Sequence, residues 1–255
     1  IGRCDMRNPL NKRTKRELKH EWGRYLAIFC FITLMIGFTS GMLATDHSME
    51  VTYNESFEKY NIEDGHFRLS AAPDESFIKN IEDENDVKLY DISYKEVTAG
   101  KNKYRIFVNR EKVNKASLMD GRLPEKSDEL GIDRLFAKNN SLKIGDTVKL
   151  KCKSFKIVGL IALSDYSALF PKNTDTIFNA QDFTVATVTN EGFDRLSDAA
   201  ITPVFAWKNS KNLSETKQKK LYDDLAKYIA IKAAYQQITL DEFIPAKENQ
   251  AIIFT

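Results

Sequence analysis

The stretch from Tyr25 to Thr45, YLAIFCFITLMIGFTSGMLAT, runs for 21 residues without a charge and decides how the chain is organised. At about 1.5 Å of rise per residue, a helix of this length extends roughly 31 Å and matches a hydrocarbon core of about 30 Å. It is apolar all round, whereas a buried helix of a soluble protein usually keeps a polar stripe. A cleaved secretory signal has an apolar part of only about 7–15 residues. We therefore predict an uncleaved transmembrane helix over residues 25–45.

The residues before this helix are strongly basic. Residues 1–24 contain eight Lys and Arg and three acidic residues, a net charge of +5, whereas the rest of the chain has a net charge of −3. Because Lys and Arg concentrate on the cytoplasmic side of spanning helices, we predict a cell-membrane protein with a cytoplasmic N-terminus and an extracytoplasmic domain over residues 46–255. Trp22, Arg24 and Tyr25 are the expected anchors at the inner interface, where amphipathic side chains suit the headgroup layer.

The basic segment itself has a helical pattern. Thr14, Leu18, Trp22 and Tyr25 share one helical face, and basic residues surround them. One interpretation of residues 1–24 is an amphipathic helix that binds membrane lipid on the inner surface. The other interpretation is a plain topology signal, because the charge count alone would set the orientation. The sequence leaves both open.

Two glycines inside the predicted span form a G-x-x-x-G motif. Gly37 and Gly41 are one helical turn apart, and such a pair lets a second helix approach closely. We expect these residues to pack against further transmembrane helices or a second copy of the chain. Glycines without a partner helix remain the alternative, since glycine is common in membrane helices.

The sequence offers little chemistry. It contains no nucleotide-binding P-loop, dinucleotide fingerprint, nucleophile elbow or H-E-x-x-H zinc motif. In the predicted topology only Cys152 lies outside, so the exterior domain cannot hold an internal disulfide. His47 and His66 are the only exterior histidines, too few for a three-histidine zinc site. The exterior part is slightly acidic, which argues against a nucleic-acid partner. We therefore expect no enzymatic activity, no cofactor and no metal.

The exterior part is predicted to be α+β. Helical patterns occur over residues 46–60, after Asp74, over 133–140 and over 214–235. Strand patterns occur over residues 66–71, 87–98, 104–108, 129–132, 147–152, 155–162, 176–178, 183–189 and 202–207. The middle is mostly β, and the flanking pieces each pair strands with a helix. This pattern predicts one domain, residues 46–103 and 200–245, interrupted by a β-rich insert over residues 104–199.

Three stretches together resemble the MacB/FtsX-type ABC transporter permeases. The first is RTKRELKHEWGRYLAIFCFITLMIGFTSGM (13–42), a basic helix that runs into a membrane span. The second is DGRLPEKSDELGIDRLFAKNNSLKIGDTVKL (120–150) followed by FKIVGLIA (155–162), similar to the family's G-R-x-P and [LI]-G-D-x-[VL]-x-L series. The third is LDEFIPAKENQAIIFT (240–255), similar to the stretch leading toward the second span in long Firmicutes-type members.

This resemblance implies a first transmembrane helix and a MacB-like extracytoplasmic core domain, in which a β-rich sabre-like part interrupts a mixed porter-like part. It implies mechanotransmission, in which a separate cytoplasmic ATPase subunit moves the outer domain for export, extraction or resistance. Family permeases continue with further spans, so the chain is expected to be a fragment. The alternative function is a membrane-anchored extracellular sensor or binding module without transport activity.

Overall fold

The computed structural model describes residues 19–166, 169–171, 180–211 and 214–246, apart from the side chains of residues 44–54 and 215. The chain divides into two units, Ile1–Glu55 and Ser56–Thr255. Most of the first unit that is described belongs to helix α2 (Trp22–Lys59), which is 38 residues long and ends in the second unit. The helix predicted over residues 25–45 and its continuation over residues 46–60 both fall in α2. Thr14 and Leu18 lie outside the described residues.

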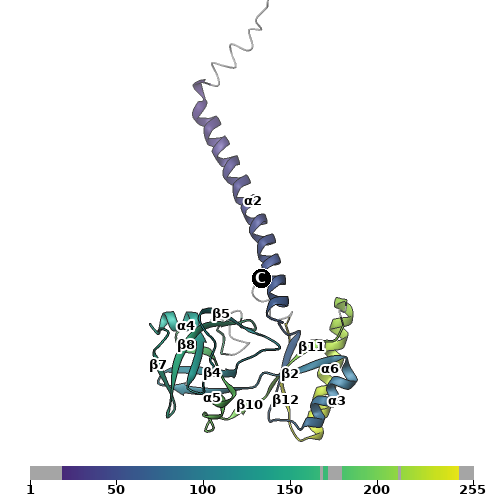
Figure 1. Ribbon diagram of the computed structural model, residues 1–255. Coiled ribbons are helices and arrows are strands. Elements are labelled where there is room, and N and C mark those ends of the chain that lie inside the picture. The colour runs from purple at the N-terminus through teal and green to yellow at the C-terminus, as the bar shows by residue number, and fades with distance from the viewer. Residues whose placement is uncertain (1–18, 167–168, 172–179, 212–213, 247–255) are drawn as a thin grey trace, which may run out of the picture. The chain divides into compact units, whose positions relative to one another are not determined.

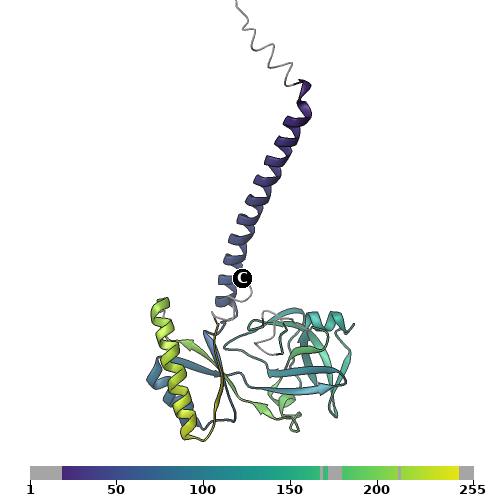
Figure 2. The same cartoon turned by 180° about the vertical axis from the view of Figure 1, so that it is seen from behind.

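The second unit contains a four-stranded antiparallel sheet. Its order is β12 (Leu240–Pro245), β1 (Gly65–Leu69), β11 (Val204–Asn209) and β2 (Val87–Asp91). Helices α3 (Glu75–Asn85) and α6 (Glu215–Tyr235) cover one face, and Figure 2 shows α6 along the side of the sheet away from the rest of the unit. Phe67 and Trp207 are fully buried in the core between this sheet and the helices.

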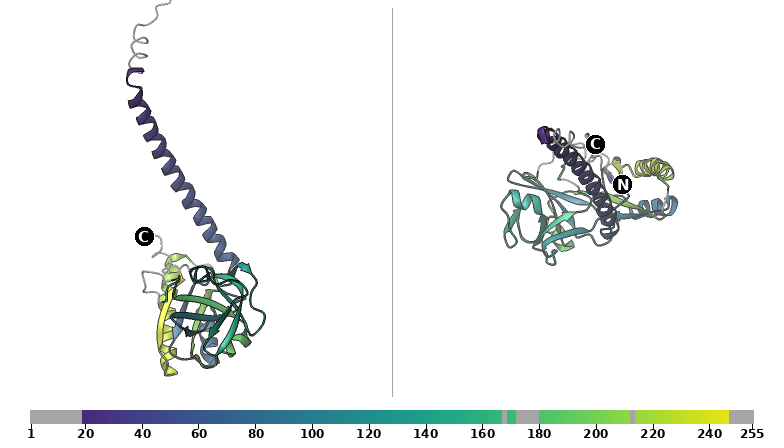
Figure 3. Two further views of the ribbon diagram at one scale, coloured as in Figure 1. Left: turned by 90° about the vertical axis from the view of Figure 1, so that its left-hand side faces the viewer. Right: turned by 90° about the horizontal axis from the view of Figure 1, so that it is seen from above.

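The second sheet has eight strands and mixed direction. Strand β4 (Asn102–Val108) pairs in parallel with β9 (Phe183–Val188), and β6 (Glu129–Asp133) pairs in parallel with β8 (Lys153–Leu163). Figure 3 shows that the strands curl, and the side chains on their inner side form an apolar core. Short helices α4 (Arg134–Asn139) and α5 (Asn190–Asp194) complete this part. The path of the sheet is β10 (Ile201–Thr202), β3 (Tyr94–Ala99), β4 (Asn102–Val108), β9 (Phe183–Val188), β6 (Glu129–Asp133), β8 (Lys153–Leu163) and β5 (Ala116–Gly121), with β7 (Thr147–Leu150) paired to β8.

The α+β class is therefore confirmed. The single strand expected over residues 87–98 is two strands, because the chain bends after Asp91 and β3 joins the eight-stranded sheet. The Asp91 carboxylate accepts a hydrogen bond from the Ser93 amide at 2.8 Å, and the Ile92 amide donates to the Val204 carbonyl at 2.9 Å. The chain passes from one sheet to the other at residues 92–93 and again at residue 203.

Several elements differ from their sequence patterns. Strands β5 and β12 were not among the strands predicted from the sequence. The strand expected over residues 176–178 lies outside the described residues. The helix expected after Asp74 is α3, and the Asp74 carboxylate caps it by accepting a hydrogen bond from the Phe77 amide at 2.9 Å.

Candidate functional site

The first part of the candidate site is the apolar segment Trp22–Leu43 of α2, which Figure 1 shows as a long helix. It is 22 residues long, and none of it is buried in protein. The hydroxyls of Thr33 and Thr39 each donate to a carbonyl one turn earlier at 2.8 Å, so these polar groups are satisfied within the helix. An exposed apolar helix of this length is the feature of a membrane-anchored protein.

The predicted packing residues lie on this exposed segment. Gly37 and Gly41 are four positions apart and therefore share one face of α2. A Cβ atom added at either glycine would meet no atom within 4 Å. The helix surface at these glycines thus has room for a close neighbour, and their role in packing stays a prediction.

The predicted interface anchors occupy the first turn of α2. Trp22 and Tyr25 are both exposed and lie three positions apart. The Arg24 guanidinium donates to the Glu21 carboxylate at 3.2 Å, in an ion pair that is open to solvent. The structure brings these side chains to one end of the apolar segment, where interfacial residues are expected.

The second part of the site is the end of α2 within the second unit. Asn61 follows the helix with a left-handed backbone conformation (φ 47°), which asparagine adopts readily at a helix end. The carbonyls of Tyr60 and Asn61 accept hydrogen bonds from the amides of Lys115 and Asn114, at 3.0 and 3.1 Å. The Lys208 ammonium on β11 donates to the Ile62 carbonyl at 2.7 Å. The helix end is thus bonded both to the loop before β5 and to the four-stranded sheet.

A buried polar group, which we call the foot cluster, follows directly. It consists of Glu63, His66, Arg110, Asn114 and Asp165. One oxygen of the Glu63 carboxylate bonds His66 Nδ1, and the other accepts from the side-chain amide of Asn114. The Asn114 side-chain oxygen accepts from the Glu63 amide at 2.9 Å. Arg110 and Asp165 form an almost fully buried ion pair at 2.7 Å.

The charges of the foot cluster stabilise one another. Burial favours the neutral form of both Glu63 and His66, but their mutual attraction outweighs it. The pKa of Glu63 is therefore lowered, with help from Arg110, and the pKa of His66 is raised, with help from Asp165. The sequence did not indicate this cluster, because no local pattern connects His66 with Arg110, Asn114 and Asp165.

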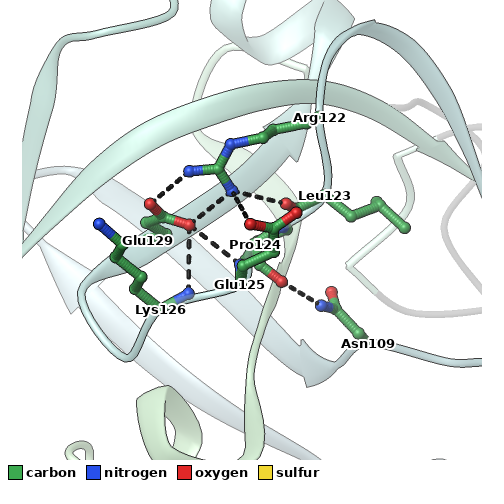
Figure 4. Close-up of polar contacts among 7 residues, drawn as sticks. All are labelled: Asn109, Arg122, Leu123, Pro124, Glu125, Lys126 and Glu129. Atoms are coloured by element: carbon green, nitrogen blue, oxygen red, sulfur yellow. Dashed lines mark hydrogen bonds and ion pairs between the residues drawn. The ribbon is translucent and has the colours of Figure 1, made fainter.

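The third part, shown in Figure 4, is the G-R-x-P motif. The Arg122 guanidinium binds both oxygens of the Glu129 carboxylate, one of them at 2.7 Å. The same carboxylate accepts from the backbone amides of Glu125 at 2.9 Å and Lys126 at 3.2 Å. The hydrogen bond from Arg122 is the main cause that lowers the pKa of Glu129 to about 2. The motif therefore closes a tight, charge-assisted turn.

The glycines of the family-like motifs meet beside this turn, at what we call the motif corner (Gly121, Arg122, Glu129, Gly145 and Gly159). Gly121 has φ 76°, and a Cβ there would lie 2.3 Å from the Val158 carbonyl oxygen. A Cβ at Gly159 would lie 2.1 Å from the Arg122 carbonyl oxygen. The Gly145 amide donates to the Ile157 carbonyl at 2.8 Å. At Gly121 and Gly159 the close backbone atoms leave no room for a Cβ atom, whereas Gly145 has open space around it and a positive φ of 100°, which favours glycine.

A polar cleft of about 370 Å³ lies between the two sheets. The Arg105 guanidinium donates to the Glu96 carboxylate at 2.7 Å, to the Tyr166 hydroxyl at 2.8 Å and to the Pro171 carbonyl at 2.7 Å. Burial raises the pKa of Tyr166 to about 12. Within the described part of the chain, no group of three or more His, Cys, Asp or Glu could hold a metal ion. The cleft is lined by charged and apolar residues that include Arg68, Tyr94, Lys103, Ile201 and Asp241.

No family model and no curated protein matches the chain. Among solved structures, it is similar to the periplasmic region of MacB from Actinobacillus actinomycetemcomitans, with 11% identity and a TM-score of 0.41, over 76% of this chain and 94% of that chain. It is also similar to the extracellular domain of the noncanonic ABC-type transporter YknZ from Gram-positive bacteria, with 12% identity and a TM-score of 0.38, over 69% of this chain and 100% of that chain.

Proposed function

We propose that the chain is the first transmembrane helix and the extracytoplasmic domain of an ABC transporter permease. It would transmit movement from a separate cytoplasmic ATPase subunit to the domain. The observation that carries this proposal is the continuity of α2. The helix has 38 residues and no proline, and it runs from the exposed apolar segment to the bonded end at Tyr60 and Asn61. At about 1.5 Å of rise per residue the helix is roughly 57 Å long, and in this proposal it carries the movement toward the domain.

The sequence motifs support the assignment to a permease family in this proposal. The stretches that resemble MacB/FtsX-type permeases include the basic flank, the apolar segment and the residues of the motif corner. The close contacts at Gly121 and Gly159 give those motif residues a physical reason to occur together. In this proposal, Trp22, Arg24 and Tyr25 bind lipid at the inner interface, and Gly37 and Gly41 pack against another span.

The proposal predicts a stable ATPase partner. We expect a P-loop ATPase to co-purify with the tagged full-length protein from its native membrane, as identified by mass spectrometry. The double variant Gly37→Leu/Gly41→Leu should weaken assembly with the other spans several-fold, because it removes the close-approach face. Phe38→Leu, at an exposed position of the same segment, is the matched control. Full-length protein that retains no ATPase in any mild detergent would contradict the proposal.

The proposed orientation is tested by Cys152, which is exposed in the turn between β7 and β8. A membrane-impermeant maleimide added to intact spheroplasts should label this thiol, and Cys152→Ser should abolish the labelling. Labelling only in permeabilised cells would show that the domain lies on the cytoplasmic side, opposite to the proposed orientation. A correct orientation without an ATPase partner would favour the membrane-anchored sensor or binding module, for which the cleft between the sheets offers a place for a small polar ligand.

A further inference from the structure

The foot cluster lies where the end of α2 meets both sheets. Glu63 is the fourth residue after the end of α2, and its carboxylate binds a residue from each sheet region. His66 belongs to β1 in the four-stranded sheet. Asn114 precedes β5 of the eight-stranded sheet. One carboxylate thus connects the helix end to both sheets through side-chain contacts.

Backbone bonds hold this connection in place. The amides of Asn114 and Lys115 donate to Asn61 and Tyr60, and the Glu63 amide donates back to the Asn114 side chain. Asn114 is fully buried and has a left-handed conformation (φ 47°), so its side chain is held facing Glu63. The Tyr60 hydroxyl also bonds the Ser117 hydroxyl at 2.8 Å. Every one of these groups would have to lose a partner if α2 moved apart from the loop before β5.

We propose that Glu63, His66 and Asn114 form a joint that makes both sheets follow α2, and that the joint holds only while His66 is charged. The inference rests on the proposed transmission of movement, and it names the residues that position the moving parts. A neutral His66 would leave the Glu63 carboxylate buried beside Asn114 with a weaker partner. An uncompensated buried charge is strongly unfavourable, so the joint would open.

The charges that act on the imidazole come from three places in the chain. Glu63 lies before β1, Asp165 follows β8, and Glu242 lies on β12, and all three favour the charged form. Arg110 acts on Glu63 and pairs with Asp165. On the same face of β1 as His66, the Arg68 guanidinium lies 3.6 Å from the Glu242 carboxylate.

The direction of the pH dependence follows from these charges. The pKa of His66 is raised above its usual 6.5, so the pair with Glu63 is fully present below pH 6.5 and is lost as the pH rises through the raised value. The pKa of Glu63 is lowered from 4.5, so its contribution is lost only in acid. The imidazole side chain is 20% exposed, which gives solvent protons access to it.

The test is hydrogen exchange with mass spectrometry on the full-length protein in detergent, without the ATPase. Protection factors, corrected for the intrinsic rate at each pH, are compared at pH 6 and pH 9 for peptides covering residues 60–66 and 110–117. We expect both segments of the wild type to lose about tenfold in protection at pH 9. The fully buried strand β9 should stay unchanged as an internal reference.

Three variants test whether these residues form a pH-dependent joint or only stabilise the fold. His66→Asn keeps a hydrogen-bond donor but no charge, so its protection should be low at both pH values and free of the pH-dependent loss. Glu63→Gln and Asn114→Gly should loosen both segments together by about tenfold at pH 6. Glycine is chosen because it tolerates the positive φ of Asn114. Glu58→Gln, an exposed carboxylate in the last turn of α2, is the matched control and should change neither segment.

The outcomes distinguish this inference from the proposed function. Equal protection at pH 6 and pH 9 in the wild type, the same pH-dependent loss in His66→Asn, or loosening of one segment alone would overturn the joint, whether or not an ATPase binds. Conversely, the joint can pass this test while no ATPase co-purifies, which would overturn only the proposed function. In the assembled transporter, Glu63→Gln should leave ATPase co-purification unchanged.

Discussion

The two sheets of the second unit are built from the chain in different ways. The eight-stranded sheet comes from one continuous stretch, residues 94–202, whereas the four-stranded sheet joins residues 65–91 to residues 204–245. Their cores differ as well. The smaller core is strongly aromatic, with Trp207 stacked on Phe243 at 4.5 Å and on Phe67 at 6.4 Å, whereas Ile, Val and Leu predominate in the larger core.

This difference makes the smaller sheet dependent on the larger one. If the eight-stranded sheet unfolds, the two pieces of the smaller sheet are connected only by a long flexible loop, and closing that loop costs entropy. Val204 and Ala206 on β11 also pack into the larger core. We therefore expect damage to the small core to stay local and damage to the large core to open both sheets.

The largest expected effect comes from Trp207→Ala. Trp207 is fully buried, and its loss should lower the free energy of unfolding by about 3–5 kcal/mol. Hydrogen exchange should show β1, β11 and β12 opening while β9 remains protected. Trp207→Phe, which keeps a ring, should cost less. Tyr235→Ala, at a side chain 81% exposed on α6, is the control and should change the stability by less than about 0.5 kcal/mol. Equal loss of protection in both sheets would contradict the asymmetry.

Gly159→Ala is the converse experiment, because it damages the larger core instead of the smaller one. The added Cβ would lie 2.1 Å from the Arg122 carbonyl oxygen, and neither atom can turn aside, because the Cβ position is fixed by its own backbone and the oxygen is a backbone atom. Overpacking of this kind costs about 1–3 kcal/mol, measured by urea unfolding of the full chain. Exchange should now increase in both sheets. Gly23→Ala adds the same methyl group where no atom lies within 4 Å, so it should leave both sheets unchanged. Opening confined to the eight-stranded sheet would show that the smaller sheet is independent.

A smaller effect is expected from Asp133→Ala, which removes the cap of α4 in the eight-stranded sheet region. The Asp133 carboxylate accepts from the amides of Leu135 at 2.8 Å and Phe136 at 3.1 Å. Loss of a helix cap typically costs about 1 kcal/mol, and Asp133→Asn should cost less because it keeps an acceptor. Thermal unfolding of the three proteins checks the order. An Asn variant as unstable as the Ala variant would show that the charge, rather than the cap, stabilises this helix.

The passage of the chain between the two sheets shows which structural features the local sequence predicts and which it does not. The apolar segment, the cap at Asp74 and the hairpin at Gly100 follow from residues that lie within a few positions of one another, and all three are present. The buried positions change phase at the bend, from Val87 and Leu89 to Ile92 and Tyr94, but this change alone does not say that the chain passes to another sheet. The bend depends on the distant partner Val204, to whose carbonyl the Ile92 amide donates.

The candidate site is predictable to the same limited extent. The pair Gly37 and Gly41 can be recognised in the sequence, because residues four positions apart lie on the same face of a helix. The foot cluster is invisible in sequence, because Glu63 and Asn114 meet only through tertiary folding. The motif glycines were noticed as a pattern, but the reason for Gly159, the approach of the Arg122 carbonyl, required the pairing of β5 with β8.

The smallest expected effect on stability at neutral pH comes from Glu129→Gln in the eight-stranded sheet, and this effect depends most strongly on pH. The pKa of Glu129 is lowered from 4.5 to about 2, so its charge stabilises the fold above pH 4.5, and this contribution is lost as the pH falls toward 2. At neutral pH the effect should be small, because the Arg122 side chain is 43% exposed and solvent screens the pair. Urea midpoints measured at pH 5 and pH 3 should therefore fall more steeply for the wild type than for the variant.

Glu125→Gln is the matched control for this acid dependence. Its carboxylate also lies near Arg122, at 3.6 Å, but it is 73% exposed. The control should keep the wild-type slope between pH 5 and pH 3, since the bidentate partner Glu129 remains. If both variants flatten the slope equally, the general charge of the turn is responsible rather than the Arg122–Glu129 pair. If neither does, the acid sensitivity of the domain comes from elsewhere, and the foot cluster, with its lowered pKa at Glu63, becomes the group to test next.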